Sequence, residues 1–252
     1  MLRLSIWFSQ RDAIVEVCRP MIKPESSARL EHFPSAMKTT LDHLVVTAPS
    51  LGAGVAWIED LFGITMSPGG KHPRMGTHNS LLKVGPQQYL EVIASDPEQS
   101  APNRSRWFGL DHLQQSSPPL LVTWVARTTS IHETVQASPW NPSSVETMNR
   151  GTFQWSITIP SHAEWIKNSH LPLLIQWGDE RHPTNLLPNA PIRLLSLQVF
   201  DPQPEKLQDM LDRMSFSENE HRPVVLVGEA ELRADFQTPR GRVVLSSMSG
   251  RL

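Results

Sequence analysis

Three residues that could do chemistry lie within runs of apolar and β-branched residues: His43, His78 and Glu91. A neutral imidazole and a carboxylate together suit a divalent metal ion such as Zn, Mn, Fe or Ni, and an incompletely filled coordination shell would let substrate oxygens bind the ion directly. Without a metal, an ionised Glu91 in such a run needs another compensating charge, which Arg74 or another basic side chain could supply in an ion pair or an anion-binding pocket. A histidine in an apolar strand is also, more often than not, a hydrogen-bonded structural residue. These interpretations stay open at this point.

Other familiar chemistries lack their motifs. The single cysteine, Cys18, excludes an internal disulfide and a thiolate metal cluster, and it fits a reducing, cytoplasmic compartment. The chain contains neither the Gly-x-Ser-x-Gly turn of many hydrolases nor the glycine fingerprint of dinucleotide-binding proteins. Nucleophilic hydrolysis and nicotinamide chemistry are therefore poorly supported.

Composition predicts an ordinary soluble protein. The 252 residues are 39% hydrophobic and 19% charged, with a formal net charge of -2. A chain so close to neutral offers no broad basic field for phosphate backbones or anionic lipid, so neither nucleic acid nor a membrane is an expected partner. Core packing explains most of the eight tryptophans, although one or two could line an apolar pocket.

The elements that must position the three residues become recognisable from residue 41 onward. Leu41–Ala48 predicts a largely buried strand. Ser50 can cap a helix that ends at Gly63, because apolar residues recur between them at helical spacing, at Leu51, Val55, Ile58 and Phe62. Three extended pieces follow, at Ile64–Met66, Thr77–Val84 and Tyr89–Ala94.

This order of strand, helix and three strands recurs twice more, with drifting sequence. The second copy runs from Leu120 to Trp177 and carries an insertion around residues 161–170, and the third runs from Ile192 to Met248. The sequence therefore predicts an α+β fold of repeated βαβββ modules at 41–97, 120–178 and 191–252. We expect the first two modules to form one domain over 38–190, with the third, diverged module packed on them.

Three motifs carry a resemblance to a known family: Leu41-Asp42-His43-Leu44-Val45-Val46, Gly76-Thr77-His78-Asn79 and Tyr89-Leu90-Glu91-Val92-Ile93. The chain resembles glyoxalase-like proteins of the vicinal-oxygen-chelate superfamily, which includes glyoxalases, bleomycin-resistance proteins and dioxygenases. The resemblance implies a cup-shaped, partly open β-barrel with helices outside and a divalent metal ion inside. His43 falls at the ligand position of the first strand, and Glu91 at that of the last strand of the same module. Strand alternation could bring His78 to the face of Glu91, as a third ligand or proton carrier.

The later modules match the ligand pattern less well. Gln176 falls roughly at the position of Glu91, and Ser196 falls near that of His43. A glutamine carbonyl is a weaker ligand than a carboxylate for a hard cation. Further ligands could enter from loops, at His72, His162, His170 or His182.

The resemblance implies a metal-dependent lyase, isomerase or dioxygenase that acts on a small substrate with vicinal oxygens. In that interpretation His43, Glu91 and His78 hold the metal, and Glu91 and His78 take part in catalysis. The alternative is a non-catalytic protein of the same fold that binds and sequesters a small molecule, and a protein-binding scaffold is a third. Modules can pair within one chain or across two, so a homodimer also stays open.

Residues 1–37 show neither clean periodicity nor the zones of a secretory signal. We expect them to be an N-terminal extension that is either not translated, with initiation at Met37, or disordered. A short ordered arm packed on the main body is the rival interpretation.

Overall fold

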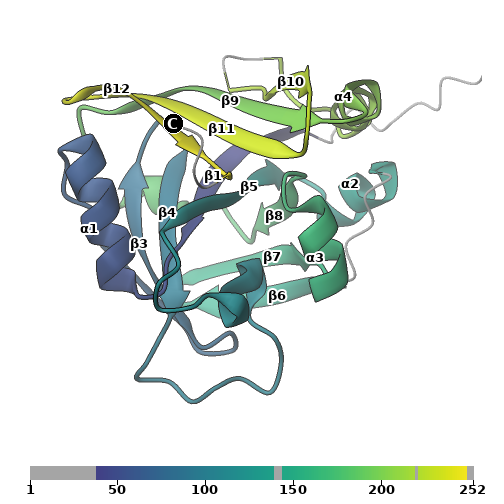
Figure 1. Ribbon diagram of the computed structural model, residues 1–252. Coiled ribbons are helices and arrows are strands. Elements are labelled where there is room, and N and C mark those ends of the chain that lie inside the picture. The colour runs from purple at the N-terminus through teal and green to yellow at the C-terminus, as the bar shows by residue number, and fades with distance from the viewer. Residues whose placement is uncertain (1–37, 139–143, 219–220, 249–252) are drawn as a thin grey trace, which may run out of the picture. The chain divides into compact units, whose positions relative to one another are not determined.

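The computed structural model describes residues 38–138, 144–218 and 221–248, which belong to one compact unit of the chain spanning 33–252. The expectations for residues 1–37 lie outside the described residues. Figure 1 labels the α-helices and most of the strands. No helix in the described part is both long and apolar enough to cross a membrane.

An eight-stranded sheet forms the larger layer of the unit (Figure 1). Its strand order is β2-β3-β4-β1-β5-β8-β7-β6. The strands are β1 (Thr39–Thr47), β2 (Ser67–His72), β3 (Thr77–Lys83), β4 (Tyr89–Ser95), β5 (Leu120–Thr128), β6 (Ser144–Arg150), β7 (Phe153–Ile159) and β8 (Leu173–Trp177). Because β1 pairs with β4 in parallel and with β5 antiparallel, β1 and β5 join two halves of like topology at the centre of the sheet.

The helix of the first half begins and ends where the sequence predicts. In α1 (Leu51–Phe62) the Ser50 side chain accepts a hydrogen bond from the Ala53 backbone N–H, and Gly63 adopts a φ of 69°. That left-handed conformation carries no steric penalty for glycine. The second half contains α2 (Ile131–Ala137), and α3 (His162–Asn168) fills the predicted insertion. Two 3-10 helices, η1 (Trp107–His112) and η2 (Pro183–Asn185), lie in the loops.

The two edges of the sheet approach each other because the sheet curls. Arg74, just after β2, donates from Nη1 to the Thr147 carbonyl of β6 at 2.9 Å. Arg150 at the end of β6 donates from Nη1 to Asn79 Oδ1 of β3 at 3.1 Å. The curled half-barrel and its helices confirm the predicted α+β class and cup-shaped architecture.

A second sheet contains the strands of the third segment, in the order β10-β9-β11-β12. Its elements are β9 (Arg193–Asp201), α4 (Pro204–Arg213), β10 (Val224–Val227), β11 (Glu231–Thr238) and β12 (Gly241–Ser246). The element order is that of a βαβββ module, but the pairing differs. The strand parallel to β9 is the next strand, β10, whereas the strand parallel to β1 is the last of its module, β4. The domain boundary at residues 190 and 191 stays a prediction.

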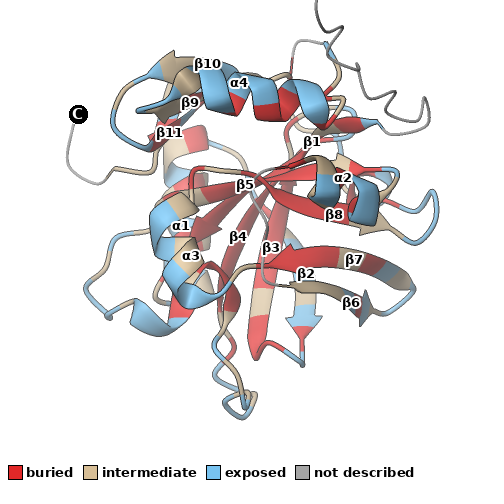
Figure 2. Cartoon of the chain, turned by 90° about the vertical axis from the view of Figure 1, so that its right-hand side faces the viewer, coloured by how far each residue is buried: buried red, intermediate tan, exposed pale blue. Residues whose placement is uncertain are grey.

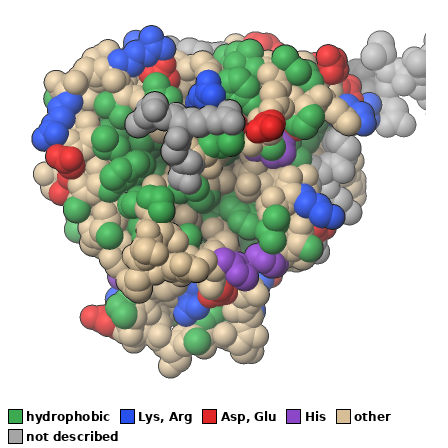
Figure 3. All heavy atoms as spheres, viewed as in Figure 1, with side chains coloured by type: hydrophobic (Ala, Val, Ile, Leu, Met, Phe, Trp, Pro, Cys, Tyr) green, Lys and Arg blue, Asp and Glu red, His purple; other side chains and the backbone are tan. Residues whose placement is uncertain are grey.

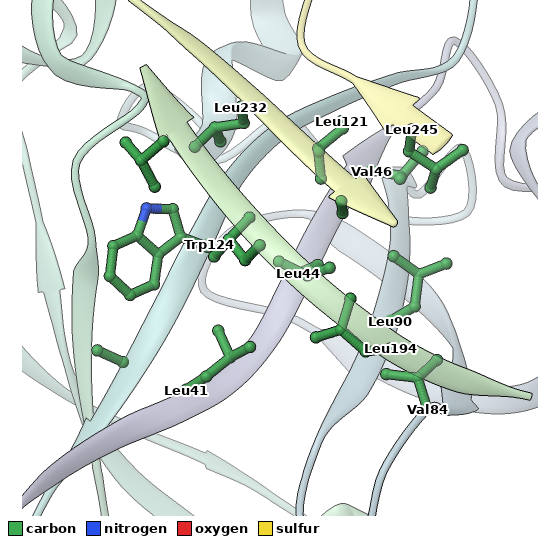
Figure 4. Close-up of a cluster of buried hydrophobic side chains, with 14 of the residues drawn as sticks. Leu41, Leu44, Val46, Val84, Leu90, Leu121, Trp124, Leu194, Leu232 and Leu245 are labelled. Carbon is green, nitrogen blue, oxygen red and sulfur yellow. The ribbon is translucent and has the colours of Figure 1, made fainter. Parts of the chain in front are cut away.

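The core lies between the two sheets. Figure 4 shows Leu44, Leu90 and Trp124 of the large sheet in one cluster with Leu194, Leu232 and Leu245 of the second sheet. The other face of the large sheet carries a separate apolar cluster, which includes Val45, Ile93, Val125, Ile157 and Ile175. The central strands are consequently buried on both faces, as the red strands of Figure 2 show.

Candidate functional site

His43 is oriented by a carboxylate beside it in the chain. The pairing of β1 with β5 shifts register between Leu41 and His43, so Asp42 has no partner on β5. Such a bulge lets neighbouring side chains depart from strict alternation and re-aims them. His43 Nδ1 lies 2.7 Å from Asp42 Oδ1. Because an ionised carboxylate can only accept, this contact places the His43 proton on Nδ1 and leaves the lone pair on Nε2.

Glu91 reaches the same place from β4. Its Oε2 lies 3.6 Å from His43 Nε2, and both side chains are more than nine-tenths buried. Asn79 donates from Nδ2 to the other oxygen, Glu91 Oε1. The structure therefore brings together the two residues that the motifs placed at ligand positions.

His78 does not join them. In the pairing of β3 with β4, His78 lies opposite Ala94 and Leu81 lies opposite Glu91. Directly opposed residues share a face and successive residues alternate, so His78 lies on the other face of the sheet from Glu91. Its Nδ1 is 3.9 Å from Asp96 Oδ1. The expectation that His78 shares a face with Glu91 was wrong. The next residue, Asn79, lies on that face instead.

The positively charged residue of this group is Arg150. It is not Arg74, which the sequence offered as a partner for Glu91. Arg74 pairs with Glu146 at 2.8 Å. Arg150 instead donates from Nη1 to Asn79 Oδ1 and, at 3.4 Å, to His72 Nε2. Burial, followed by the positive charge of Arg150, lowers the pKa of His72 to about 3, so His72 is a neutral acceptor.

These residues surround a small cavity inside the cup, called here the inner cavity. Its volume is about 30 Å³. The Tyr89 ring stacks on the His43 ring at 4.5 Å between centroids. The lining residues are His43, His72, Asn79, Leu81, Tyr89, Glu91, Trp107, Phe108, Arg150, Trp155, Ile157, Ile175 and Trp177.

Asp42 connects this cavity to a second histidine. Its Oδ2 lies 3.0 Å from His182 Nε2 and accepts a hydrogen bond from Trp177 Nε1 at 3.0 Å. Burial raises the pKa of Asp42, but hydrogen bonds from His182 and His43 outweigh burial and hold it well below its usual value. Asp42 is therefore an ionised, fully buried anchor, a role that the sequence did not reveal.

The other candidate ligands lie elsewhere. Gln176 accepts a hydrogen bond from the Ile131 backbone N–H at 2.8 Å, so it caps α2 rather than facing the cavity. Ser196 pairs with Asp235 in the second sheet. His170 contacts Asp201 at 2.7 Å, and His162 stacks on His112.

His43 and Glu91 could supply two ligands to a metal ion, which is fewer than a complete protein site has. His43 Nε2 and Glu91 Oε2 are close enough to share one ion, and the carboxylate behind His43 is the usual outer-shell partner of a metal-binding histidine. Catalytic zinc sites usually have three protein ligands. The described residues offer no cluster of three His, Cys, Asp or Glu side chains that could hold an ion. A metal here would depend on water or substrate oxygens for the rest of its shell.

Comparison with known proteins places the chain in a family. No curated protein matches. A solved hypothetical protein from Staphylococcus aureus is 15% identical with a TM-score of 0.49, over 85% of this chain and 87% of that chain. Methylmalonyl-CoA epimerase from Mycobacterium tuberculosis is 15% identical with a TM-score of 0.35, over 54% of this chain and 85% of that chain. The model of the Glyoxalase-like domain matches residues 41–215, which is most of the chain. This protein belongs to the glyoxalase-like domain family.

Proposed function

We propose that this protein is a lyase or isomerase that acts in the inner cavity on a small substrate with vicinal oxygens. The observation that carries the proposal is the pair formed by His43 Nε2 and Glu91 Oε2, 3.6 Å apart. Two buried groups that can exchange a proton, enclosed together by aromatic rings, are typical of a catalytic site. One of them would remove a proton from the carbon next to a substrate carbonyl and then return it to the resulting enediolate, at the same carbon or at the neighbouring one.

The surrounding residues favour this role. Asp42 fixes the His43 ring so that the Nε2 lone pair faces the cavity, and it would stabilise the imidazolium formed when Nε2 takes a proton. Asn79 holds Glu91 by one oxygen and leaves Oε2 for substrate. Arg150, whose guanidinium lines the same cavity, could stabilise the negative charge that develops on a substrate oxygen.

The proposal has a metal-dependent form, in which His43 and Glu91 hold a Zn, Mn, Fe or Ni ion. A bound ion would polarise the substrate oxygens. The dioxygenase form of the family would require a redox-active ion at the same two residues. Both forms are tested by metal analysis of tag-free protein beside Glu91→Ala. About one ion per chain, lost in the variant, would support them, and no ion after reconstitution would count against them.

Turnover is tested by incubating the protein with 1,2-dicarbonyl and 2-hydroxycarbonyl compounds and following them by proton NMR. We expect conversion of at least one compound by wild type and a loss of about 100-fold or more in Glu91→Gln, the usual scale of general acid-base catalysis. Glu98→Gln is the matched control, because the Glu98 side chain is 76% exposed and pairs with Lys71. Equal turnover by both variants would refute the assignment.

A second candidate function is non-catalytic binding of a small molecule. It is favoured by the second half of the cup, where Ile175 and Trp177 of β8 line the cavity and offer no ligand atom for a metal. A binder should keep its ligand affinity in His43→Ala and without metal, whereas an enzyme should lose activity in His43→Ala. Calorimetric titration of wild type and His43→Ala measures the affinity, and the turnover assay on the same two proteins measures the activity. Together they separate the two functions.

A further inference from the structure

A second, larger pocket lies between η1 and α3. Its volume is about 200 Å³, several times that of the inner cavity. Trp107, Phe108 and Ile157 line both spaces and so separate them. Figure 3, which has the same view as Figure 1, shows hydrophobic side chains gathered around a hollow on this face, with basic and histidine side chains near its edge. The proposed reaction does not use this η1–α3 pocket.

Aromatic rings form much of its wall. Phe108 packs on Trp107 at 5.3 Å and on Trp165 of α3 at 5.9 Å between ring centroids. Phe108 has a φ of 57°, and only one other described residue besides glycine, Ser215, has a positive φ. A side chain in the left-handed region is held there by its surroundings, and such strain concentrates at ligand sites. The wall is therefore a built arrangement that suits a flat, apolar ring.

Two arginines also line the pocket. Arg104 uses Nη1 to pair with Glu146 at 2.7 Å, and Arg106 uses Nη1 to pair with Asp111 at 2.6 Å. A guanidinium group has five N–H donors, so both side chains keep donors for a further acceptor. Their fork geometry matches a carboxylate.

From this combination we propose that the η1–α3 pocket binds an aromatic carboxylate. The ring lies against Trp107, Phe108 and Trp165. The carboxylate binds Arg104 and Arg106.

The test uses benzoate as the probe, with benzamide as the analogue that keeps the ring and lacks the negative charge. Calorimetric titration of the full-length protein should show saturable binding of benzoate at one site and about tenfold weaker binding of benzamide. In a ¹⁵N NMR spectrum the indole N–H signal of Trp165, assigned with Trp165→Phe, should shift on addition of the probe. The double variant Arg104→Gln/Arg106→Gln should bind at least about tenfold more weakly.

His43→Ala and Arg181→Gln are the matched controls. His43 lines the inner cavity and not the η1–α3 pocket. The variant His43→Ala should therefore bind the probe as tightly as wild type, even if the proposed reaction is wrong. Arg181 is exposed and pairs with Asp179, away from the pocket. Trp165→Ala gives a second measurement if the double variant does not fold, and it should also weaken binding. No saturable binding, unchanged binding in Trp165→Ala, or binding lost in His43→Ala would overturn the proposal.

Discussion

His72 should make the protein sensitive to mild acid. Its ring is buried, and Nε2 accepts a hydrogen bond from Arg150 while Nδ1 contacts Thr77 Oγ1 at 3.2 Å. Protonation of Nε2 would remove the acceptor and place two positive charges together. Burial and Arg150 accordingly lower the pKa of His72 from 6.5 to about 3 in the folded protein.

The sign and size of the effect follow from these two values. Below pH 6.5 the unfolded chain binds a proton at residue 72 that the folded chain does not, so stability falls as the pH decreases and stops falling near pH 3. One pKa unit corresponds to about 1.4 kcal/mol, so this group should remove about 2.5 kcal/mol between about pH 7 and about pH 4.5. The variant His72→Gln keeps an acceptor for Arg150 and loses the titration.

Urea unfolding followed by tryptophan fluorescence at both pH values measures the difference. We expect the stability of wild type relative to His72→Gln to decrease by about 2.5 kcal/mol on acidification. Carboxylates titrate in both proteins and cancel in the comparison. His132→Gln, which removes an exposed histidine of α2, controls for the loss of a histidine as such. A wild-type to His72→Gln difference that is the same at both pH values would refute the reasoning.

Further predictions concern the packing around the site. Asp42→Asn should cost roughly 2–4 kcal/mol in urea unfolding, because three donors, two of them buried, share this carboxylate; a loss below about 0.5 kcal/mol would contradict its role as an anchor. Leu44→Ala should cost about 2–5 kcal/mol, since Leu44 is fully buried between the two sheets, and a change in melting temperature of less than about 2 °C would count against that packing. Gly54→Ala would place a Cβ 2.6 Å from Val92 Cγ1 and should cost about 1–3 kcal/mol. In the same helix Gly52→Ala meets nothing within 4 Å and should instead stabilise by about 0.5–1 kcal/mol, so an equal effect of the two substitutions would contradict the packing of α1.

Local patterns predicted most elements of the first module, but the extended piece expected at Ile64–Met66 was wrong, since that strand is Ser67–His72. The strand β1, the N-cap Ser50 of α1 and its C-cap Gly63 each follow from the types of a few neighbouring residues. All three are present in the structure. The strand β6 has little signal in the sequence, because its seven residues are mostly polar and its pairing depends on β7. The pairing within the second sheet was also beyond the sequence, since strand order depends on contacts between distant segments.

Prediction of the site failed where it depended on register and on distant contacts. Family motifs placed His43 and Glu91 at ligand positions, but the choice between His78 and Asn79 required the β3–β4 register, in which a shift of one residue exchanges the faces. Arg150 reaches Asn79 from 71 positions away in the chain, at the end of β6. A single sequence gives no local signal for such a contact.

The central claim is that His43 and Glu91 exchange protons with a substrate in the inner cavity. The most direct measurement is the exchange of solvent deuterium into the C–H group next to the carbonyl of 2-hydroxycarbonyl compounds, followed by proton NMR in D₂O. We expect exchange above the buffer rate with wild type and Glu98→Gln, reduced by about 100-fold or more in Glu91→Gln and His43→Ala. Exchange that is as fast with these two variants as with wild type would contradict the claim.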